Sequence, residues 1–285
     1  MGATAAANRR LRCVGRALAA TRSAEESGGW DGATMPPPPH LFRDSRMQED
    51  TNARFHHPGT AVVYSAPAIP LDDVDSLVQA VQRDGFVVLR GAMSRQWVAA
   101  CREAFAPRLA EWVRRKGEND PATRNRGAFR HYIDMPMSRP FSDLLASPHL
   151  DAVLSGVLGP DVVCDQFASD TPLPGSRLPG GTQDPLAAVT STYQDVHGDL
   201  GDHDGGPTNV LAVNWPLCHV TELNGPFEMA VGGHTHRIPS DGAREAVTSG
   251  RAVLSRLLMS EGDVLIRDPR CVHRASPNLS DAPRP

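Results

Sequence analysis

From Asp161 onward the sequence is a series of short strand-like runs separated by glycine and proline clusters, and this pattern restricts the fold most. The runs are VVCDQFA, TSTYQDVH, NVLAVNWPL, PFEMAV, GDVLIRD and RCVHRA. Short strands with frequent turns are typical of an antiparallel sandwich or barrel. The chain has 25 glycines and 25 prolines, which supply the turns that such a fold needs.

The part of the chain before Asp161 predicts helices. Residues 71–85 place four apolar side chains on one helical face that ends at Gly85: Val74, Leu77, Val78 and Val81. The run FVVLRG (86–91) follows as a short buried strand. Ser94 is expected to cap a helix, bent by Pro107, that carries Trp97, Cys101, Phe105 and Trp112. With two further short helices over 141–159, the chain predicts an α+β fold that is mainly β with flanking helices.

Composition and charge exclude several classes of protein. The chain of 285 residues is 40% hydrophobic and has a net charge of -4, which suits a globular core and gives no basic surface for nucleic acid. No apolar run approaches the roughly 20 residues of a membrane span. The cysteines are odd in number and scattered, so no disulfide framework is expected and a reducing, intracellular compartment is predicted: Cys13, Cys101, Cys164, Cys218 and Cys271. Zinc ligation by Cys218-His219 or by Cys271 with His273 is disfavoured, because no close CxxC pair accompanies them.

Residues 1–58 are predicted to form a disordered extension, followed by one domain over 59–285. Five arginines precede the first acidic residue, which is the composition of a mitochondrial or plastid transit peptide: Arg9, Arg10, Arg12, Arg16 and Arg22. A disordered basic tail explains the composition equally well, as does upstream sequence before a start at Met35 or Met47; without a transit peptide the protein would be cytoplasmic. The run MPPPPH and the polar stretch to His57 read as a linker.

The stretch YQDVHGDLGDHDGG (193–206) carries two histidines and four aspartates, too many charges for a buried strand. It is therefore either an acidic turn or part of a metal site. If STYQDVHGDL is a strand, His197 and Asp199 lie two residues apart on one face and can bind one ion. His273, at the end of the last strand-like run, is the candidate third ligand. Two histidines and one carboxylate form the facial triad of non-haem Fe(II) oxygenases, which leaves positions open for cosubstrate and O₂.

Other residues near this stretch have simpler interpretations. Asp195 shares a face with His197 and gives a reversed match to the same pattern. The residues of the GDHDGG turn are expected to be solvated or to gate the pocket: Asp202, His203 and Asp204. Two more histidines are expected near the pocket mouth and not on the metal, since one triad suffices: His234 and His236. The insert PGSRLPGGTQDPL (174–186) reads as a long loop.

The end of the sequence, HRASPNLSDAPRP, places Arg284 eleven residues after His273. If the chain turns after Asn278 and returns as a strand, Arg284 would lie beside the metal pocket. A buried guanidinium there suits a bidentate grip on a small dicarboxylate.

In this order the features resemble the phytanoyl-CoA dioxygenase family of Fe(II)/2-oxoglutarate oxygenases, over about residues 70–285. The resemblance rests on the opening helix and GFVVLRG strand, the HxD with an upstream Gln194, NGPFEMAVGGH (224–234), and the distal histidine followed by arginine at eleven. It implies a double-stranded β-helix, the cupin-like jelly roll. It also implies that His197, Asp199 and His273 bind Fe(II), that Asp199 and not Asp195 is the carboxylate ligand, and that Arg284 binds 2-oxoglutarate.

Some positions depart from the family pattern or fit it loosely. Trp215 falls where some members place a tryptophan against the cosubstrate, although a core aromatic is an equal alternative. The serine that some members place two residues after the distal histidine is replaced by Ala275, with Ser276 next to it. The chain stops at Pro285, where the strand carrying Arg284 should begin. We therefore expect a domain truncated at its C-terminal end, with a frayed Arg284 that binds 2-oxoglutarate weakly.

Together these features predict a dioxygenase that hydroxylates a small organic or acyl-type substrate and releases succinate and CO₂. The alternative is a catalytically impaired jelly-roll binding or interaction protein with a vestigial metal site. A zinc hydrolase using the same triad is a more distant alternative. The expected partner is a small-molecule substrate, whose identity the sequence does not give because no CoA-binding signature is visible. The oligomeric state does not follow from the sequence either.

Overall fold

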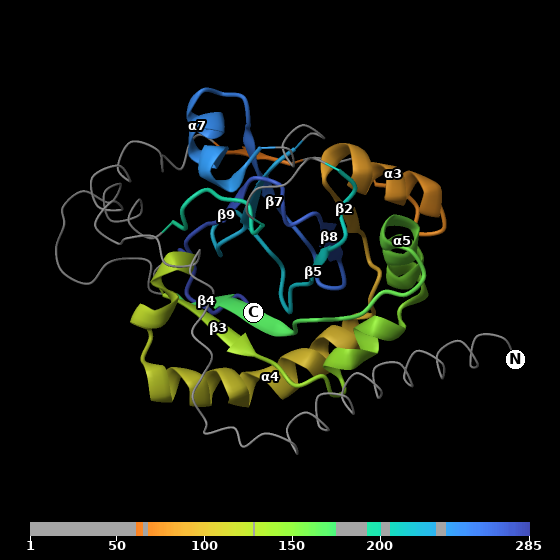
Figure 1. Ribbon diagram of the computed structural model, residues 1–285. Coiled ribbons are helices and arrows are strands. Elements are labelled where there is room, and N and C mark those ends of the chain that lie inside the picture. The colour runs from red at the N-terminus through yellow and green to blue at the C-terminus, as the bar shows by residue number, and fades with distance from the viewer. Residues whose placement is uncertain (1–60, 65–67, 128, 175–192, 201–205, 232–237) are drawn as a thin grey trace, which may run out of the picture. The chain divides into compact units, whose positions relative to one another are not determined.

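In the computed structural model the strands form sheets that the predicted helices flank (Figure 1). The structure describes residues 61–64, 68–127, 129–174, 193–200, 206–231 and 238–285, which all belong to one compact unit, Thr51–Pro285. The predicted extension 1–58 and nearly all of the 174–186 insert lie outside the described residues. Among the described residues, no helix is long and apolar enough to cross a membrane.

Three sheets are found among the described residues. The first has the strand order β1 (Val62–Val63), β7 (Leu254–Leu257), β6 (Phe227–Ala230), β9 (His273–Ala275). The second has the order β2 (Phe86–Leu89), β8 (Val264–Arg267), β5 (Ala212–Asn214), and the third pairs β3 (Arg130–Asp134) with β4 (Ala168–Pro172). Neighbouring strands are antiparallel, apart from the parallel pair β1 and β7. The predicted mainly antiparallel β-body is confirmed.

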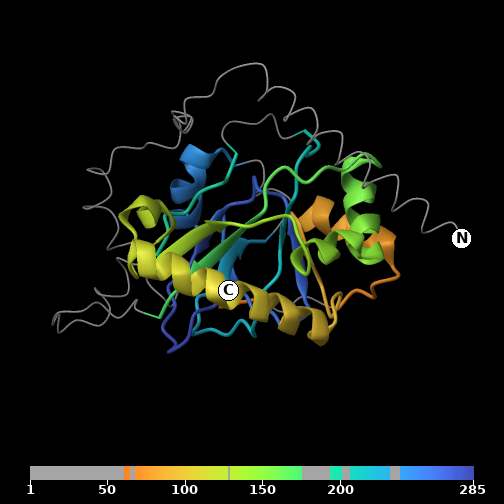
Figure 2. The same cartoon turned by 90° about the horizontal axis from the view of Figure 1, so that it is seen from below.

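The helices lie around these sheets. They are α3 (Val74–Asp84), α4 (Arg95–Lys116), α5 (Pro148–Leu158) and α7 (Ala243–Thr248), with 3₁₀ turns η4 (Pro121–Arg126), η5 (Phe141–Ala146) and η7 (Ser240–Gly242). Two views show α4 running along the β3–β4 pair (Figures 1 and 2). Helix α5 packs against α3 so closely that a Cβ built on Gly156 would lie 2.6 Å from Val78 Cγ2.

The predicted helix boundaries are confirmed by the capping contacts. The Asp73 side chain accepts a hydrogen bond from the Ser76 N–H at the start of α3, and Gly85 ends that helix in the left-handed region at φ 83°. Ser94 Oγ accepts the Trp97 N–H at the start of α4, as expected, and Pro107 lies inside that helix. The stretch 141–159 forms η5 and α5, with Ser147 capping α5.

Two predicted strands were wrong or incomplete. VVCDQFA is not a strand, because β4 begins only at its last residue and continues into SDTP, and Val163 is 72% exposed. The run TSTYQDVH was also predicted as a strand, but its described residues, 193–197, form a single β-bridge, at His197. The pairing partner β3 was missed because its charged residues hide the alternation. Arg130 is buried with its guanidinium paired to Asp170 at 3.0 Å and bonded to the Ser276 carbonyl at 3.3 Å. The short elements β1, β7 and α7 were also missed.

The core lies on both faces of the sheet that contains β2 and β8. Val264 and Ile266 pack toward the helices, in a cluster with Leu77 of α3 and Phe105 of α4. Leu265 points the other way and packs against Met229 of β6, Leu257 of β7 and Cys271 before β9. Since side chains alternate along a strand, Arg267 shares the face of Leu265 and points between the two larger sheets. This space between the sheets is where the metal-ligand residues also lie.

Gly85 provides a test of how closely β2 approaches the chain before β9. A Cβ on Gly85 would lie 2.0 Å from Cys271 Sγ, and the backbone already has a positive φ. We expect Gly85→Ala to lower the free energy of unfolding by about 2–5 kcal/mol, from left-handed strain plus overpacking. Chemical denaturation measures this directly.

Gly91→Ala is the matched control, because Gly91 has φ 63° but nothing within 4 Å of its Cβ position. It should show only the left-handed strain of about 1–2 kcal/mol. Equal losses in both variants would mean that the contact with Cys271 contributes nothing.

Candidate metal centre

The ligand residues predicted from the sequence meet through a short backbone pairing. The His197 N–H donates to the His273 carbonyl at 3.0 Å, and the His273 N–H donates back to the His197 carbonyl at 2.8 Å. Two residues on, the Asp199 N–H donates to the Pro269 carbonyl at 2.8 Å. The irregular segment around residue 197 is thereby attached to β9 and to the turn that precedes it.

This pairing brings three potential ligand atoms together. Asp199 Oδ1 lies 3.5 Å from His197 Nε2 and 3.4 Å from His273 Nε2, and all three atoms lie within 4.8 Å of one another. Ligands that each bind a metal at ~2.1 Å lie ~3 Å apart or slightly more, so the spacing fits one ion. Among the described residues this is the one group of histidine, cysteine or carboxylate side chains with metal-ligand spacing.

Backbone carbonyls fix which nitrogen of each imidazole faces the group. His197 Nδ1 lies 2.7 Å from the Asp195 carbonyl oxygen, and His273 Nδ1 lies 2.8 Å from the Cys271 carbonyl oxygen. A carbonyl can only accept, so each Nδ1 carries the proton and each Nε2 keeps its lone pair. Both rings are therefore oriented as metal ligands before a metal arrives.

The charge states at neutral pH also suit a divalent metal. Burial by itself would raise the pKa of Asp199, but the positive charge of Arg267 beside it outweighs burial and holds the pKa well below its usual value. Burial, opposed by Asp199, lowers the pKa of His273 to about 4. The group therefore offers one carboxylate and a neutral His273.

Sequence reasoning missed Arg267, which contacts the carboxylate ligand. Its Nη2 lies 2.8 Å from Asp199 Oδ2, and its Nε donates to Asn214 Oδ1 at 3.2 Å. The guanidinium also lies 5.0 Å from the ring centroid of Phe227, whose ring is 5.0 Å from that of His273. The available signal was an arginine inside the apolar run GDVLIRD, two residues after a core leucine.

Asp195, the alternative carboxylate, does not join the group. Its side chain pairs with Arg244 at 3.1 Å, while its carbonyl accepts the proton of His197 Nδ1. Gln194 instead bonds to the backbone of Ala275 in both directions, at 3.1 Å each, and its Nε2 lies 3.4 Å from His197 Nε2. The upstream glutamine thus lies at the metal-ligand group and the reversed aspartate does not.

Trp215 packs in the helix-side core. Its ring lies 6.1 Å from that of Trp97 on α4 and 5.6 Å from that of Phe167. Ser276, next to the substituted Ala275, donates to the Pro226 carbonyl. The histidines and aspartates predicted for the pocket mouth lie outside the described residues: Asp202, His203, Asp204, His234 and His236.

Arg284 is held in place, and the expected frayed end is a wrong prediction. The Arg284 N–H donates to the Pro172 carbonyl at 3.1 Å, and the Leu217 N–H donates to the Pro285 carbonyl at 2.9 Å. The guanidinium donates to the carbonyls of Gly225 at 2.8 Å and Asn224 at 3.4 Å, just before Phe227. These partners lie far away in the sequence, so they could not be predicted from the residues around Arg284.

Burial and then the like charge of Arg130 lower the pKa of Arg284 to about 10. Arg130 itself donates to Asp170 Oδ1 at 3.0 Å, and Arg126 lies 3.8 Å from Asp170 Oδ2. Arg284 remains charged at neutral pH. Arg126 and Arg130 thus share one partly exposed carboxylate, Asp170, whose charge also acts on Arg284.

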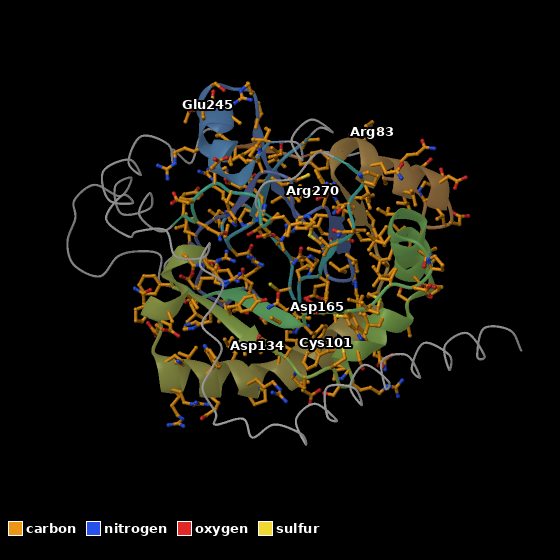
Figure 3. All side chains as sticks on the ribbon, in the orientation of Figure 1. Arg83, Cys101, Asp134, Asp165, Glu245 and Arg270 are labelled. Carbon is orange, nitrogen blue, oxygen red and sulfur yellow. The ribbon has the colours of Figure 1, made fainter. Side chains whose placement is uncertain are left out.

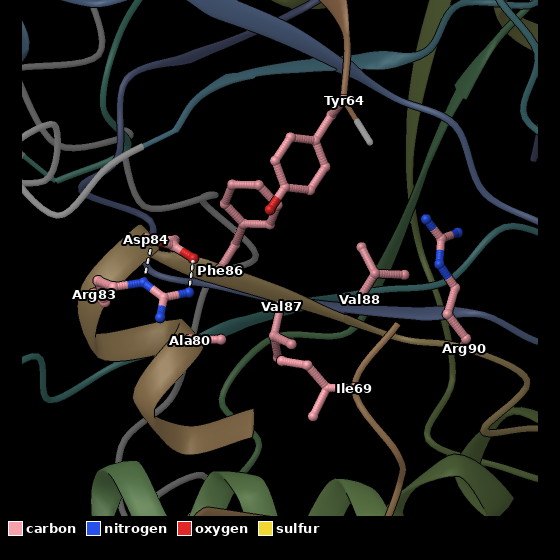
Figure 4. Close-up of a pocket in the computed structure, with 9 residues that line it drawn as sticks. All are labelled: Tyr64, Ile69, Ala80, Arg83, Asp84, Phe86, Val87, Val88 and Arg90. Carbon is pink, nitrogen blue, oxygen red and sulfur yellow. Dashed lines mark hydrogen bonds and ion pairs between the residues drawn. The ribbon is translucent and has the colours of Figure 1, made fainter. Parts of the chain in front are cut away.

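A separate hollow is lined by residues of α3 and β2 together with Tyr64, Ile69 and Arg90 (Figure 4). Its walls combine apolar side chains with charged ones, among them the Arg83–Asp84 ion pair. None of its lining residues belongs to the metal-ligand group. Arg83 lies on an outer helix, whereas Arg270, close in sequence to His273, lies among the strands (Figure 3).

Comparisons with solved structures agree with the observed fold. EvdMO1 matches with a TM-score of 0.53 and 22% identity, over 74% of this chain and 48% of that one, so the chain spans about half the length of EvdMO1. AviO1 from Streptomyces viridochromogenes Tue57 matches with a TM-score of 0.51 and 20% identity, over 77% of this chain and 93% of that one. The non-heme alpha ketoglutarate dependent carbocyclase SnoK from nogalamycin biosynthesis matches with a TM-score of 0.51 and 16% identity, over 77% of this chain and 84% of that one. The expected α+β jelly-roll core is confirmed.

The sequence itself matches a family model. The model of phytanoyl-CoA dioxygenase (PhyH) covers residues 81–285, which is most of the chain and includes the whole metal-ligand group. The chain therefore belongs to the phytanoyl-CoA dioxygenase family of non-haem Fe(II)/2-oxoglutarate-dependent oxygenases.

Proposed function

We propose that this dioxygenase hydroxylates a small organic or acyl-type substrate, with conversion of 2-oxoglutarate to succinate and CO₂. The observation that carries the proposal is the convergence of His197 Nε2, Asp199 Oδ1 and His273 Nε2 within 4.8 Å. Both lone pairs and the ionised carboxylate are already oriented toward one point. Iron bound there would supply the O₂ chemistry, which no side chain of the chain can perform.

We assign the three metal-ligand residues to iron and leave the opposite face of the ion to cosubstrate and O₂. The neighbouring residues have positioning roles. The Asp195 and Cys271 carbonyls hold the imidazole protons, and Gln194 holds β9 beside His197. Trp215 stays a candidate cosubstrate contact, although its contacts with Trp97 and Phe167 are those of a core aromatic.

We assign the distal carboxylate of 2-oxoglutarate to Arg284. The support is electrostatic: the half-buried Arg284 guanidinium is exposed to the like charge of Arg130, and Asp170 is already shared by Arg126 and Arg130. A carboxylate that arrives at this cluster offsets repulsion between like charges and gains charge-assisted hydrogen bonds. A dicarboxylate with one end on the metal suits such a site.

We further propose that the catalytic domain spans residues 59–285 behind an extension at 1–58. The described cysteines are all free thiols, which supports an intracellular location: Cys101, Cys164, Cys218 and Cys271. The arginine-rich beginning supports the mitochondrion or plastid, and the cytoplasm is the alternative.

Turnover without added substrate tests the proposal. Protein supplied with Fe(II), 2-oxoglutarate and O₂ should release succinate slowly, and mass spectrometry of metabolite mixtures should then detect a product heavier by one oxygen. Iron binding with no succinate release would favour the alternative of an impaired jelly-roll binding protein.

His197→Ala, Asp199→Ala and His273→Ala should each weaken Fe(II) binding at least ~100-fold, because two remaining ligands hold a labile divalent ion poorly. Titration calorimetry under anaerobic conditions measures the affinity. Asp195→Ala is the control, since Asp195 pairs with Arg244, and it should bind Fe(II) like the wild type. Retention of iron by Asp199→Ala would remove Asp199 from the site.

Arg284→Ala should weaken 2-oxoglutarate binding by tens- to thousands-fold, because a desolvated charge-assisted pair contributes roughly 2–5 kcal/mol. Metal-loaded protein is titrated with 2-oxoglutarate, and Arg284→Lys should recover part of the affinity since it keeps the charge. Fe(II) affinity in the absence of 2-oxoglutarate should not change. Unaltered 2-oxoglutarate affinity in Arg284→Ala would assign Arg284 to the fold alone.

A further inference from the structure

We propose that Arg267 is a built-in counter-ion of Asp199, which stabilises the metal-free site and makes tight metal binding depend on an anionic cosubstrate. The inference rests on the proposed function, because it takes His197, Asp199 and His273 as the metal site. It concerns a residue outside the triad, at the end of β8.

The two oxygens of Asp199 face different partners. Oδ2 forms an ion pair with Arg267 Nη2 at 2.8 Å, whereas Oδ1 faces His197 Nε2 at 3.5 Å and His273 Nε2 at 3.4 Å. The guanidinium is fixed in this position, because its Nε donates to Asn214 at 3.2 Å and its plane lies by Phe227. A metal must therefore bind a carboxylate whose other oxygen is already neutralised by a cation.

Burial of the Arg267 guanidinium has a large desolvation cost, which apolar packing alone does not offset. Its side chain is 10% exposed, in a strand that otherwise presents Val264, Leu265 and Ile266 to the core. Within the described residues, Asp199 is the one carboxylate that pairs with it. A buried guanidinium without that partner is strongly unfavourable, so the pair stabilises the metal-free protein.

The same charge opposes a metal that binds alone. A divalent ion at Oδ1 would lie near a fixed guanidinium, and repulsion between like charges in a partly buried site is large. Arg267 also holds the Asp199 side chain in one rotamer, which favours metal binding. This gain is limited to the conformational entropy of a single side chain, so it is smaller than the repulsion. The repulsion dominates, so Arg267 lowers the affinity for the metal by itself.

An anionic ligand reverses this balance. A divalent ion, the Asp199 carboxylate and the Arg267 guanidinium together leave two positive charges, which a dianion such as 2-oxoglutarate balances. Arg267 Nη1 is also buried and has no hydrogen-bond partner among the described residues, so the guanidinium has donor capacity left for an incoming oxygen. Because linkage is reciprocal, an anion that binds better with the metal also tightens the metal.

The experiment measures Mn(II) affinity, as a redox-stable stand-in for Fe(II), with and without saturating 2-oxoglutarate and without turnover. We expect Arg267→Met to bind Mn(II) alone at least ~10-fold more tightly than the wild type. The further tightening by 2-oxoglutarate should shrink by a similar factor. Arg267→Lys, which keeps the charge, should stay within ~3-fold of the wild type. The metal-free melting temperature should fall in Arg267→Met.

Arg90→Met is the matched control. Arg90 pairs with Asp263 at 2.7 Å, at the other end of β8 from Arg267. This variant also loses an Arg–Asp pair, but its Mn(II) affinity and its response to 2-oxoglutarate should match the wild type. If Arg267→Met does not fold, Arg267→Gln removes the charge with a polar side chain, and the same tightening is expected.

The outcomes separate this inference from the proposed function. If the wild type binds no Mn(II), or His197→Ala binds it equally well, the triad is not the metal site and both proposals are overturned. If the triad binds Mn(II) but the uncharged Arg267 variants bind it no more tightly than the wild type, the counter-ion inference alone is overturned.

Discussion

The metal-ligand geometry depends on one backbone pairing, the reciprocal hydrogen bonds between His197 and His273. The segment around His197 has no continuous strand of its own, so it could take many conformations without this contact. Pairing residues directly opposite each other brings their side chains close on one face of the sheet. Asp199 is two residues after His197, and its N–H donates to the Pro269 carbonyl. Its side chain therefore lies on the same face as the two imidazoles. Three backbone hydrogen bonds thus bring the three ligand residues together, and Gln194 adds two more between this segment and Ala275.

Those bonds in turn require the turn Asp268–Cys271 to keep its shape. Arg270 donates to both oxygens of the Asp268 carboxylate, at 2.7–3.2 Å, and both residues are buried. The Asp268 N–H donates to the Gly85 carbonyl at 2.8 Å. A Cβ on Gly198 would lie 3.0 Å from the Arg270 carbonyl oxygen, so the middle residue of the HxD has little room for a side chain. The α3 end, the turn and the ligands are therefore connected by direct contacts.

The sequence predicted the site better than the strands around it. His197, Asp199 and His273 meet as predicted, although the strand assumed for residues 190–197 is a single bridge in the described part. The His-x-Asp spacing was sufficient to predict the site, because a single bridged residue already determines which neighbouring side chains lie on the same face. The strand β3 and the role of Arg267 were missed since the charged partners are distant in sequence: Arg130 pairs with Asp170, and Arg267, in a strand that was predicted, pairs with Asp199. A guanidinium in an apolar run cannot be interpreted until its counter-charge is known.

Arginines are the recurring feature of this interior, and three of them near the metal-ligand group have different kinds of partner. Arg270 has a carboxylate of its own and serves the turn, whereas Arg267 shares a carboxylate that a metal also needs. Arg284 bonds to backbone carbonyls, which neutralise no charge. A buried guanidinium without a carboxylate of its own is unfavourable until an anion enters, because unpaired buried charge carries a large desolvation cost. This cost would favour a ligand-bound state, in which a dicarboxylate could reach both the metal-ligand group and Arg284.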